Sequence, residues 1–165
     1  MPGTEGSGRL EDLYSACGPE AGRLALLMTG DRELAADIAQ EAFIRAAGRF
    51  HDLRSKDSFR AYLRTTVVNL TKSHFRHVAV ERRHLARVAG FAEPSLSQTD
   101  LGDRDLVEGA LQTLPHRQRA AVVLRYCMDL SLKGTAEALG TTEKAVESLL
   151  YRGLATLRTE LEVDG

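Results

Sequence analysis

The feature that most restricts the fold is a stripe of apolar side chains in the middle of the chain. Its members recur at steps of three and four residues: Phe59, Tyr62, Leu63, Thr66, Val67 and Leu70. This spacing places them on one face of an α-helix. Similar patterns predict helices over about residues 10–28, 32–47, 57–87, 103–113, 115–128, 131–139 and 142–161. Because the strong helix formers Leu and Ala dominate the apolar residues, the sequence predicts an all-α fold.

Breaks between these patterns divide the chain into two small helical domains. The segment Thr29–Asp31 is typical of a helix stop followed by the cap of the next helix. Residues 49–57 lack a helical period and predict a loop, after which Asp57 or Ser58 is expected to cap the third helix. A polar stretch containing Gly and Pro begins at about residue 88. We therefore predict a first domain over residues 1–87, a flexible acidic linker over 88–103 and a second domain over 104–165.

The net charge of −1 hides a strong segregation of charge along the chain. Residues 51–90 hold nine Lys and Arg against three Asp and Glu, a net charge of +6, and four His besides. Residues 91–110 hold five Asp and Glu against one Arg, a net charge of −4. This pattern indicates a basic helix that meets phosphates and an acidic connector that avoids them.

Several classes of protein are disfavoured by the sequence. No run of 18 apolar residues could span a membrane, and the first eight residues do not resemble a secretory signal. Cys17 and Cys127 are isolated, which argues against disulfides and zinc and for a reducing cytoplasm. His74 and His77 could share a helix face, but their neighbours are cations and no acidic or Cys ligand joins them at a suitable spacing. With no phosphate loop and no nucleophile motif, we predict no metal, no cofactor and no catalytic residue.

Residues 131–152 have the pattern of a helix-turn-helix. A short helix ends at Gly140, which permits a tight turn, and Thr142 is placed to cap the next helix. Val146 and Leu150 are expected to hold this second helix down. A plain helical hairpin has the same pattern, but the basic helix in the first domain favours DNA binding. The side chains then free to face a groove are Glu143, Lys144, Glu147, Ser148, Tyr151 and Arg152.

Over nearly its whole length the chain resembles the extracytoplasmic-function group of bacterial RNA polymerase sigma factors. In the first domain the matching segments are LMTGD at 27–31, DIAQEAF at 37–43, FRAYL at 59–63 and VNL at 68–70. In the second domain they are ALQTLPHRQR at 110–119, LRY at 124–126, LS at 130–131 and ALG at 138–140. Each segment is moderately specific, but their order around an acidic linker is strongly specific.

The resemblance implies three sets of functional residues. The second helix would dock on core RNA polymerase through Asp37, Gln40 and Glu41, although a solvated helix face has the same composition. The loop 50–58 and the basic helix would capture an unpaired base and the phosphates of the minus-ten element. The residues implied there are Phe50, His51, Arg54, Lys56, Asn69, Lys72 and Arg76, with Arg82 and Arg83 as further phosphate contacts. The second domain would contact the minus-thirty-five element through Arg125, Lys144, Glu147, Ser148, Tyr151 and Arg152.

Three residues of the second domain depart from the family pattern. Glu147 and Leu149 stand where relatives frequently carry basic residues, and Gly134 stands where relatives often have a Glu that completes a capping box. Glu147 could accept a hydrogen bond from a cytosine amino group, or it could repel phosphate. Weak affinity of this domain for free DNA is therefore expected.

The resemblance implies a non-enzymatic factor, monomeric when free, that binds core RNA polymerase and promoter DNA and directs promoter-specific initiation. The linker would approach the RNA path inside the polymerase, although a solvated tether explains the same composition. An anti-sigma protein is the expected regulator. Two alternatives stay open: a stand-alone helix-turn-helix regulator, which would usually dimerise, and a sigma-like decoy that does not bind DNA.

Overall fold

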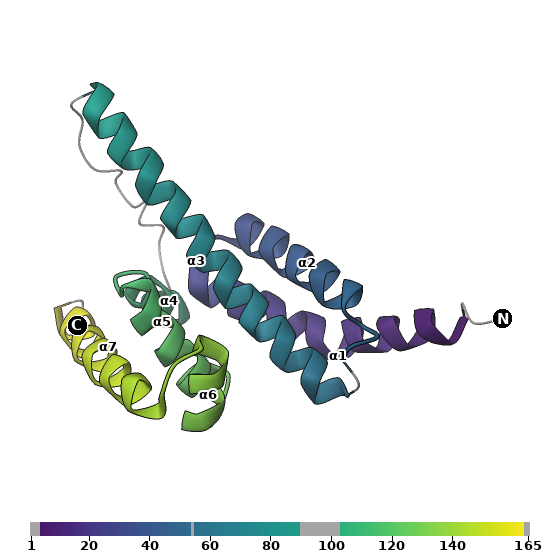
Figure 1. Cartoon of the computed structure of the whole chain (residues 1–165). Helices are drawn as coiled ribbons and strands as arrows, with labels where there is room; N and C mark the ends of the chain where they lie inside the picture. Colours follow the sequence, from purple (N-terminus) through teal and green to yellow (C-terminus); the bar gives the residue numbers. More distant parts are fainter. Residues whose placement is uncertain (1–3, 54, 90–102, 164–165) are drawn as a thin grey trace.

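The computed structural model describes residues 4–53, 55–89 and 103–163, and these residues form helices with no β-strand (Figure 1). The predicted all-α fold is confirmed. The elements are α1 Thr4–Thr29, α2 Arg32–Gly48, α3 Lys56–Ala89, α4 Asp103–Leu111, α5 His116–Val122, the π-helical turn η1 Val123–Cys127, α6 Leu132–Leu139 and α7 Glu143–Val163. None of the described helices is long and apolar enough to cross a membrane.

Helices α1, α2 and α3 pack into a bundle, named here the first bundle. Its centre contains the fully buried side chains of Leu24, Met28, Phe59, Leu63 and Val67, which come from α1 and α3. The predicted break between α1 and α2 is confirmed. Gly30 has φ +68°, a left-handed conformation that ends α1, and the Asp31 carboxylate accepts a hydrogen bond from the Leu34 N–H at 3.1 Å.

The start of α3 differs from the prediction. The helix begins at Lys56, and the Ser55 hydroxyl accepts the hydrogen bond of the Ser58 N–H at 3.0 Å. The expectation that Asp57 or Ser58 caps this helix is therefore wrong. Ser55 precedes both residues, and its hydroxyl accepts the hydrogen bond of an N–H group that has no partner within the first turn of the helix. As a result Lys56 belongs to the first turn of α3 rather than to the preceding loop.

Helices α4 to α7 and η1 form the second bundle. The single helix expected over residues 115–128 is interrupted, because α5 passes into the π-helical turn, where the Met128 N–H bonds to the Val123 carbonyl at 2.9 Å. The turn closes at Asp129, which adopts φ +58°. Tyr126 lies in this wider turn and is 54% exposed.

Helices α6 and α7 form the predicted helix-turn-helix. The Ser131 hydroxyl accepts a hydrogen bond from the Gly134 N–H at 2.9 Å, and the Thr142 hydroxyl accepts one from Ala145 at 3.1 Å. Gly140 between the helices has φ +61°, as a tight turn there requires. These caps set the direction of α7, which then packs across α5.

The two bundles lie against each other and share a continuous hydrophobic core. Figure 1 shows the second bundle alongside α1 and the middle of α3, while the C-terminal part of α3 extends beyond both bundles. Of the predicted linker, residues 90–102 lie outside the described residues.

Candidate nucleic-acid interface

The outer face of α2 is polar with an apolar centre. Asp37, Gln40 and Glu41 are exposed, as the helical spacing predicted, and Glu41 forms an ion pair with Arg45 at 2.7 Å. Ile44 follows at the next turn of the same face and is 61% exposed. Its helical neighbour Phe43 takes the core position instead. The outer face of α2 therefore combines carboxylates with one exposed large apolar side chain.

The loop between α2 and α3 carries an aromatic side chain already in contact with a cation. Phe50 is half-buried against the core, and the Arg9 guanidinium of α1 lies 5.6 Å from the centre of its ring. The His51 ring lies 5.8 Å away in an edge-on orientation. Lys56 is exposed at the start of α3, and Arg54 lies outside the described residues. The loop thus offers a partly covered aromatic ring with positive charge beside it.

A second guanidinium–aromatic pair stands next to this loop. The Arg49 guanidinium lies 5.4 Å from the ring centre of Tyr62 on α3, and its Nε lies 3.8 Å from the Asp52 carboxylate. Reasoning from sequence assigned Tyr62 to the apolar stripe and did not consider Arg49. The position of Arg49 at the start of the predicted loop 49–57 is the signal that could have drawn attention to it.

The middle of α3 presents a polar, basic row. Asn69, Lys72 and Arg76 are exposed and recur at helical spacing, so they share one side of the helix. Arg82 and Arg83 are exposed on the part of α3 that extends beyond the bundles (Figure 1). A row of amide and guanidinium groups along one helix suits a phosphate backbone.

The outer face of α7 is open to solvent. Val146 and Leu150 are buried and hold the helix against the rest of the second bundle, as predicted. Tyr151 is 80% exposed. The other exposed side chains of this face are Glu143, Lys144, Glu147, Ser148 and Arg152. Leu149 is half-buried and packs against the core, which explains why an apolar residue suits this position in this chain.

Arg125 is half-buried and partly engaged within its own bundle. One guanidinium nitrogen donates to the Leu130 carbonyl at 3.2 Å, and the group lies 5.6 Å from the ring centre of Tyr126. The π-helical turn brings these residues together, so it positions a cation and an exposed aromatic ring side by side.

A buried cation joins the two bundles. The side chain of Arg119 in α5 is only 6% exposed and donates hydrogen bonds to four backbone carbonyls. Three belong to its own bundle, at Leu111, Gln112 and Leu114, and the fourth is Met28 at the end of α1. Burial lowers the pKa of Arg119 to about 10, so the group stays charged at neutral pH. Sequence reasoning missed this residue, because a charged side chain in an amphipathic helix is ordinarily solvated.

A neutral histidine lies beside this cation. His116 contacts Thr71 of α3 at 2.9 Å through Nε2. The Thr71 hydroxyl donates its hydrogen to the Val68 carbonyl, so the imidazole N–H is the donor in this contact. Burial, followed by the charges of Arg119, Lys72 and Arg117, lowers the pKa of His116 from 6.5 to about 4. The ring is therefore neutral at physiological pH. Within the described residues, no three His, Cys, Asp or Glu side chains are grouped as a metal ion would need.

Comparison with known proteins identifies both bundles. Residues 13–79 match the family Sigma-70 region 2, and residues 104–157 match the family Sigma-70, region 4. The RNA polymerase sigma-E factor of Streptomyces avermitilis is 35% identical over 85% of this chain and 78% of its own length. The ECF RNA polymerase sigma factor SigW of Bacillus subtilis is 30% identical over 84% of this chain and 81% of its own length.

Two solved structures have the same fold. The sigma factor RpoE from Bartonella quintana, solved in complex with the anti-sigma factor NepR, gives a TM-score of 0.76 at 20% identity. That match covers 94% of this chain and 98% of the solved one. CnrH, in complex with the cytosolic domain of CnrY, gives 0.69 at 24% identity over 94% and 89% of the two chains. Taken together with the sequence matches, these findings show that the chain belongs to the extracytoplasmic-function group of RNA polymerase sigma factors, non-enzymatic subunits that direct promoter-specific transcription initiation.

Proposed function

We propose that the two bundles divide the work of promoter recognition between them. The first bundle binds core polymerase through α2 and captures the opened minus-ten strand through the loop after α2 and the basic side of α3. The second bundle reads the minus-thirty-five duplex through α7. The observation that carries this assignment is that one chain exposes an acidic docking face, a basic helix row and an open recognition helix on three separate helices.

For the docking face we propose that Asp37, Gln40 and Glu41 surround a hydrophobic contact made by Ile44. Buried apolar anchors dominate the binding energy of most interfaces, while the surrounding charges guide association. Ile44→Asp should therefore weaken binding to core polymerase by about tenfold or more. Val107→Asp, which adds the same charge at an exposed apolar residue of α4, is the matched control and should bind normally. Equal binding by both variants would exclude this face as the docking surface.

For the minus-ten strand we propose two kinds of contact. Phe50 and His51 stack on an unpaired base, with Arg54 and Lys56 supplying charge close by. Asn69 reads a base edge, since its amide both donates and accepts, while Lys72, Arg76, Arg82 and Arg83 bind phosphates. Lys72→Ala should then weaken binding to all strands alike and reduce its salt dependence.

For the minus-thirty-five duplex we propose that Glu147 reads a base. Its carboxylate lies on the open face of α7 beside Lys144, Ser148, Tyr151 and Arg152, and a carboxylate accepts a hydrogen bond from the amino group of cytosine. Arg125 would anchor the backbone at the edge of this site. Glu147→Arg should change which duplexes are selected from a random pool by holoenzyme. An increase in affinity without a change in sequence preference would instead mean that Glu147 only repels phosphate.

We further propose a cytoplasmic factor, monomeric when free, whose activity an anti-sigma protein restrains. Support comes from the two solved structures of the same fold, the sigma factor RpoE captured with the anti-sigma factor NepR, and CnrH captured with the cytosolic domain of CnrY. A stand-alone regulator would bind duplex DNA as a dimer without polymerase. A decoy would bind core polymerase or an anti-sigma protein without directing initiation. Sedimentation of the free chain, together with duplex binding in the presence and absence of core polymerase, separates these alternatives.

A further inference from the structure

Two guanidinium–aromatic pairs flank the loop between α2 and α3. The Arg9 guanidinium lies 5.6 Å from the ring centre of Phe50, and the Arg49 guanidinium lies 5.4 Å from that of Tyr62. An unpaired base can stack on either ring, because stacking needs two flat faces and no particular base. In each pair, however, the guanidinium already occupies ring surface that a base would use.

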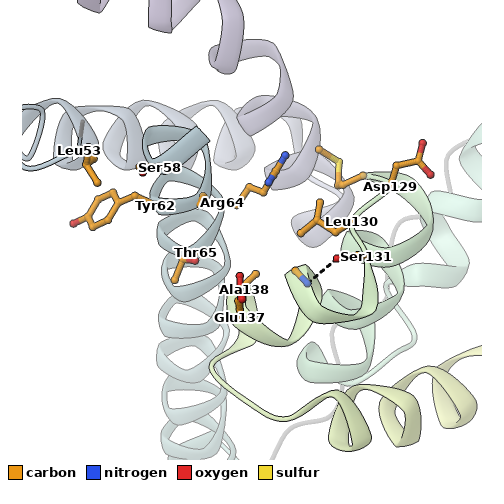
Figure 2. Close-up of a pocket in the computed structure, with 13 residues that line it drawn as sticks. Leu53, Ser58, Tyr62, Arg64, Thr65, Asp129, Leu130, Ser131, Glu137 and Ala138 are labelled. Carbon is orange, nitrogen blue, oxygen red and sulfur yellow. Dashed lines mark hydrogen bonds between the residues drawn. The ribbon is translucent and has the colours of Figure 1, made fainter. Parts of the chain in front are cut away.

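The pair of Arg49 and Tyr62 is built into the fold. Tyr62 and Leu53 both line a groove of about 640 Å³ that separates α3 from α6 and the turn before it (Figure 2). The Arg49 Nε also lies 3.8 Å from the Asp52 carboxylate, so a counter-ion stands beside this cation. A cation that already has a counter-ion gains less from a DNA phosphate. Arg49 is therefore the weaker candidate for a contact with the strand.

The pair of Arg9 and Phe50 has a different setting. Arg9 comes from the beginning of α1, which extends past the loop (Figure 1), and its side chain is exposed. Among residues 4–53, 55–89 and 103–163, no carboxylate forms an ion pair with Arg9. Phe50 itself is half-buried against the core. Arg9 thus brings a positive charge, neutralised by none of these residues, to the proposed stacking ring.

The two contacts open to Arg9 differ in strength. A cation–π contact at an exposed site is weak, because water competes for the cation. A phosphate instead accepts two parallel, charge-assisted hydrogen bonds from a guanidinium. In a DNA strand each base is joined through its sugar to a phosphate, so a base that stacks on Phe50 brings a phosphate close to Arg9. Capture of a base therefore offers Arg9 a stronger partner than the ring it leaves.

We propose that Arg9 positions the minus-ten strand by exchanging one partner for another. In the free factor its guanidinium covers the Phe50 ring. When a base stacks on that ring, the guanidinium leaves the ring and binds the phosphate of the captured nucleotide. The proposal rests on the assignment of Phe50 as a stacking residue, and it adds a contact from α1, outside the loop and α3. Because this contact is to a phosphate, Arg9 supplies affinity and no sequence preference.

The cover of the ring is measured in the free chain by fluorescence. The sequence contains no Trp, so Phe50→Trp introduces a single reporter at the ring. Adding Arg9→Ala should raise the acrylamide quenching constant by up to about twofold, since the guanidinium covers one of two ring faces. Arg32→Ala is the charge-matched control, because Arg32 is exposed at the opposite end of α2, a helix of 17 residues or about 25 Å. Equal quenching in all three chains would refute the ring contact.

The phosphate contact is measured in holoenzyme by fluorescence anisotropy with a labelled DNA single strand of random sequence. Core polymerase without the factor, measured alongside, gives the background. Arg9→Ala should weaken binding about three- to tenfold and lower the slope of log affinity against log salt by about 0.7, the value for one phosphate contact on a single strand. Arg9→Lys keeps the charge and should keep the slope, and Arg32→Ala should bind like the parent. An affinity and a slope that Arg9→Ala leaves unchanged would overturn the proposal.

Phe50→Leu separates failure of the proposal from failure of its premise. Leu keeps an apolar side chain at this half-buried position but removes the ring, so binding should fall about tenfold if a base stacks there. A loss with Phe50→Leu and none with Arg9→Ala would refute the role of Arg9 alone. A loss with Arg9→Ala and none with Phe50→Leu would refute Phe50 as the stacking residue and, with it, the exchange. No loss with either variant would refute both.

Discussion

Replacing the buried Arg119 should destabilise the protein more than the loss of an ordinary surface charge. Among the described residues, the structure assigns no other donor outside helical bonding to the carbonyls of Met28, Gln112 and Leu114, while the Leu111 carbonyl also accepts from the Leu114 N–H at 3.2 Å. Arg119→Met keeps much of the side chain's volume but leaves the carbonyls of Met28, Gln112 and Leu114 without this donor. Unpaired buried polar groups destabilise the folded state, and the apolar Met side chain does not compensate for that cost.

The size of the expected loss in unfolding free energy follows from two opposing contributions of Arg119. Four hydrogen bonds from a charged donor contribute about 1.5 kcal/mol each at the lower end, or about 6 kcal/mol together. Burial of the charge, which lowers the pKa of Arg119 from its ordinary value to about 10, costs about 3 kcal/mol. Arg119→Met should therefore lower the free energy of unfolding by about 3 kcal/mol.

Urea denaturation followed by circular dichroism measures this loss, and thermal melts should show a fall in Tm of roughly 6–12 °C. Arg119→Lys is the informative companion. It retains a buried charge, but a compact ammonium cannot reach four carbonyls, so it should be at least as unstable as Arg119→Met. A loss below about 1 kcal/mol in both variants would refute the idea that these buried hydrogen bonds stabilise the fold.

Three further expectations concern backbone geometry and pH. Gly140→Ala forces an alanine to adopt φ +61° and should destabilise the chain by about 1 kcal/mol in urea denaturation, although the space around it is empty. Gly153→Ala would place its Cβ 2.9 Å from a Val122 methyl group, so α7 must shift, and duplex binding by holoenzyme should weaken even if the unfolding midpoint changes little. The pKa of His116 is about 4 in the fold and 6.5 when unfolded. Its neutral form therefore contributes fully to the free energy of unfolding above pH 6.5, and this contribution is lost as pH falls toward 4. The loss is about 2 kcal/mol after allowance for solvent screening, and His116→Gln, whose amide can still donate to Thr71, should flatten the stability profile in that range.

Features set by local chemistry were predictable from the sequence. Asp31 and Ser131 precede helices and satisfy their free N–H groups, as their residue types suggested. Gly140 supplies the left-handed turn of the helix-turn-helix. The exposed faces of α2 and α7 also followed from helical spacing, because burial of a few apolar anchors fixes which side points outward.

Features that depend on tertiary packing were not predictable from local patterns. The π-helical turn accommodates an extra residue between α5 and α6, and nothing in the residues around Tyr126 signals this change of register. The contact of Arg9 with Phe50 joins α1 to the loop after α2, and only the folded bundle brings them together. The capping of α1 by Arg119 likewise depends on how the bundles pack, so helical periodicity in the sequence did not single out Arg119.

The direct test of the central claim is transcription reconstituted from core RNA polymerase and a pool of genomic promoter fragments, with the start sites mapped by sequencing. Adding this protein should create discrete start sites that core polymerase alone does not use, with shared elements near minus ten and minus thirty-five. Binding to core polymerase without any new start site would contradict the account and identify the chain as a decoy.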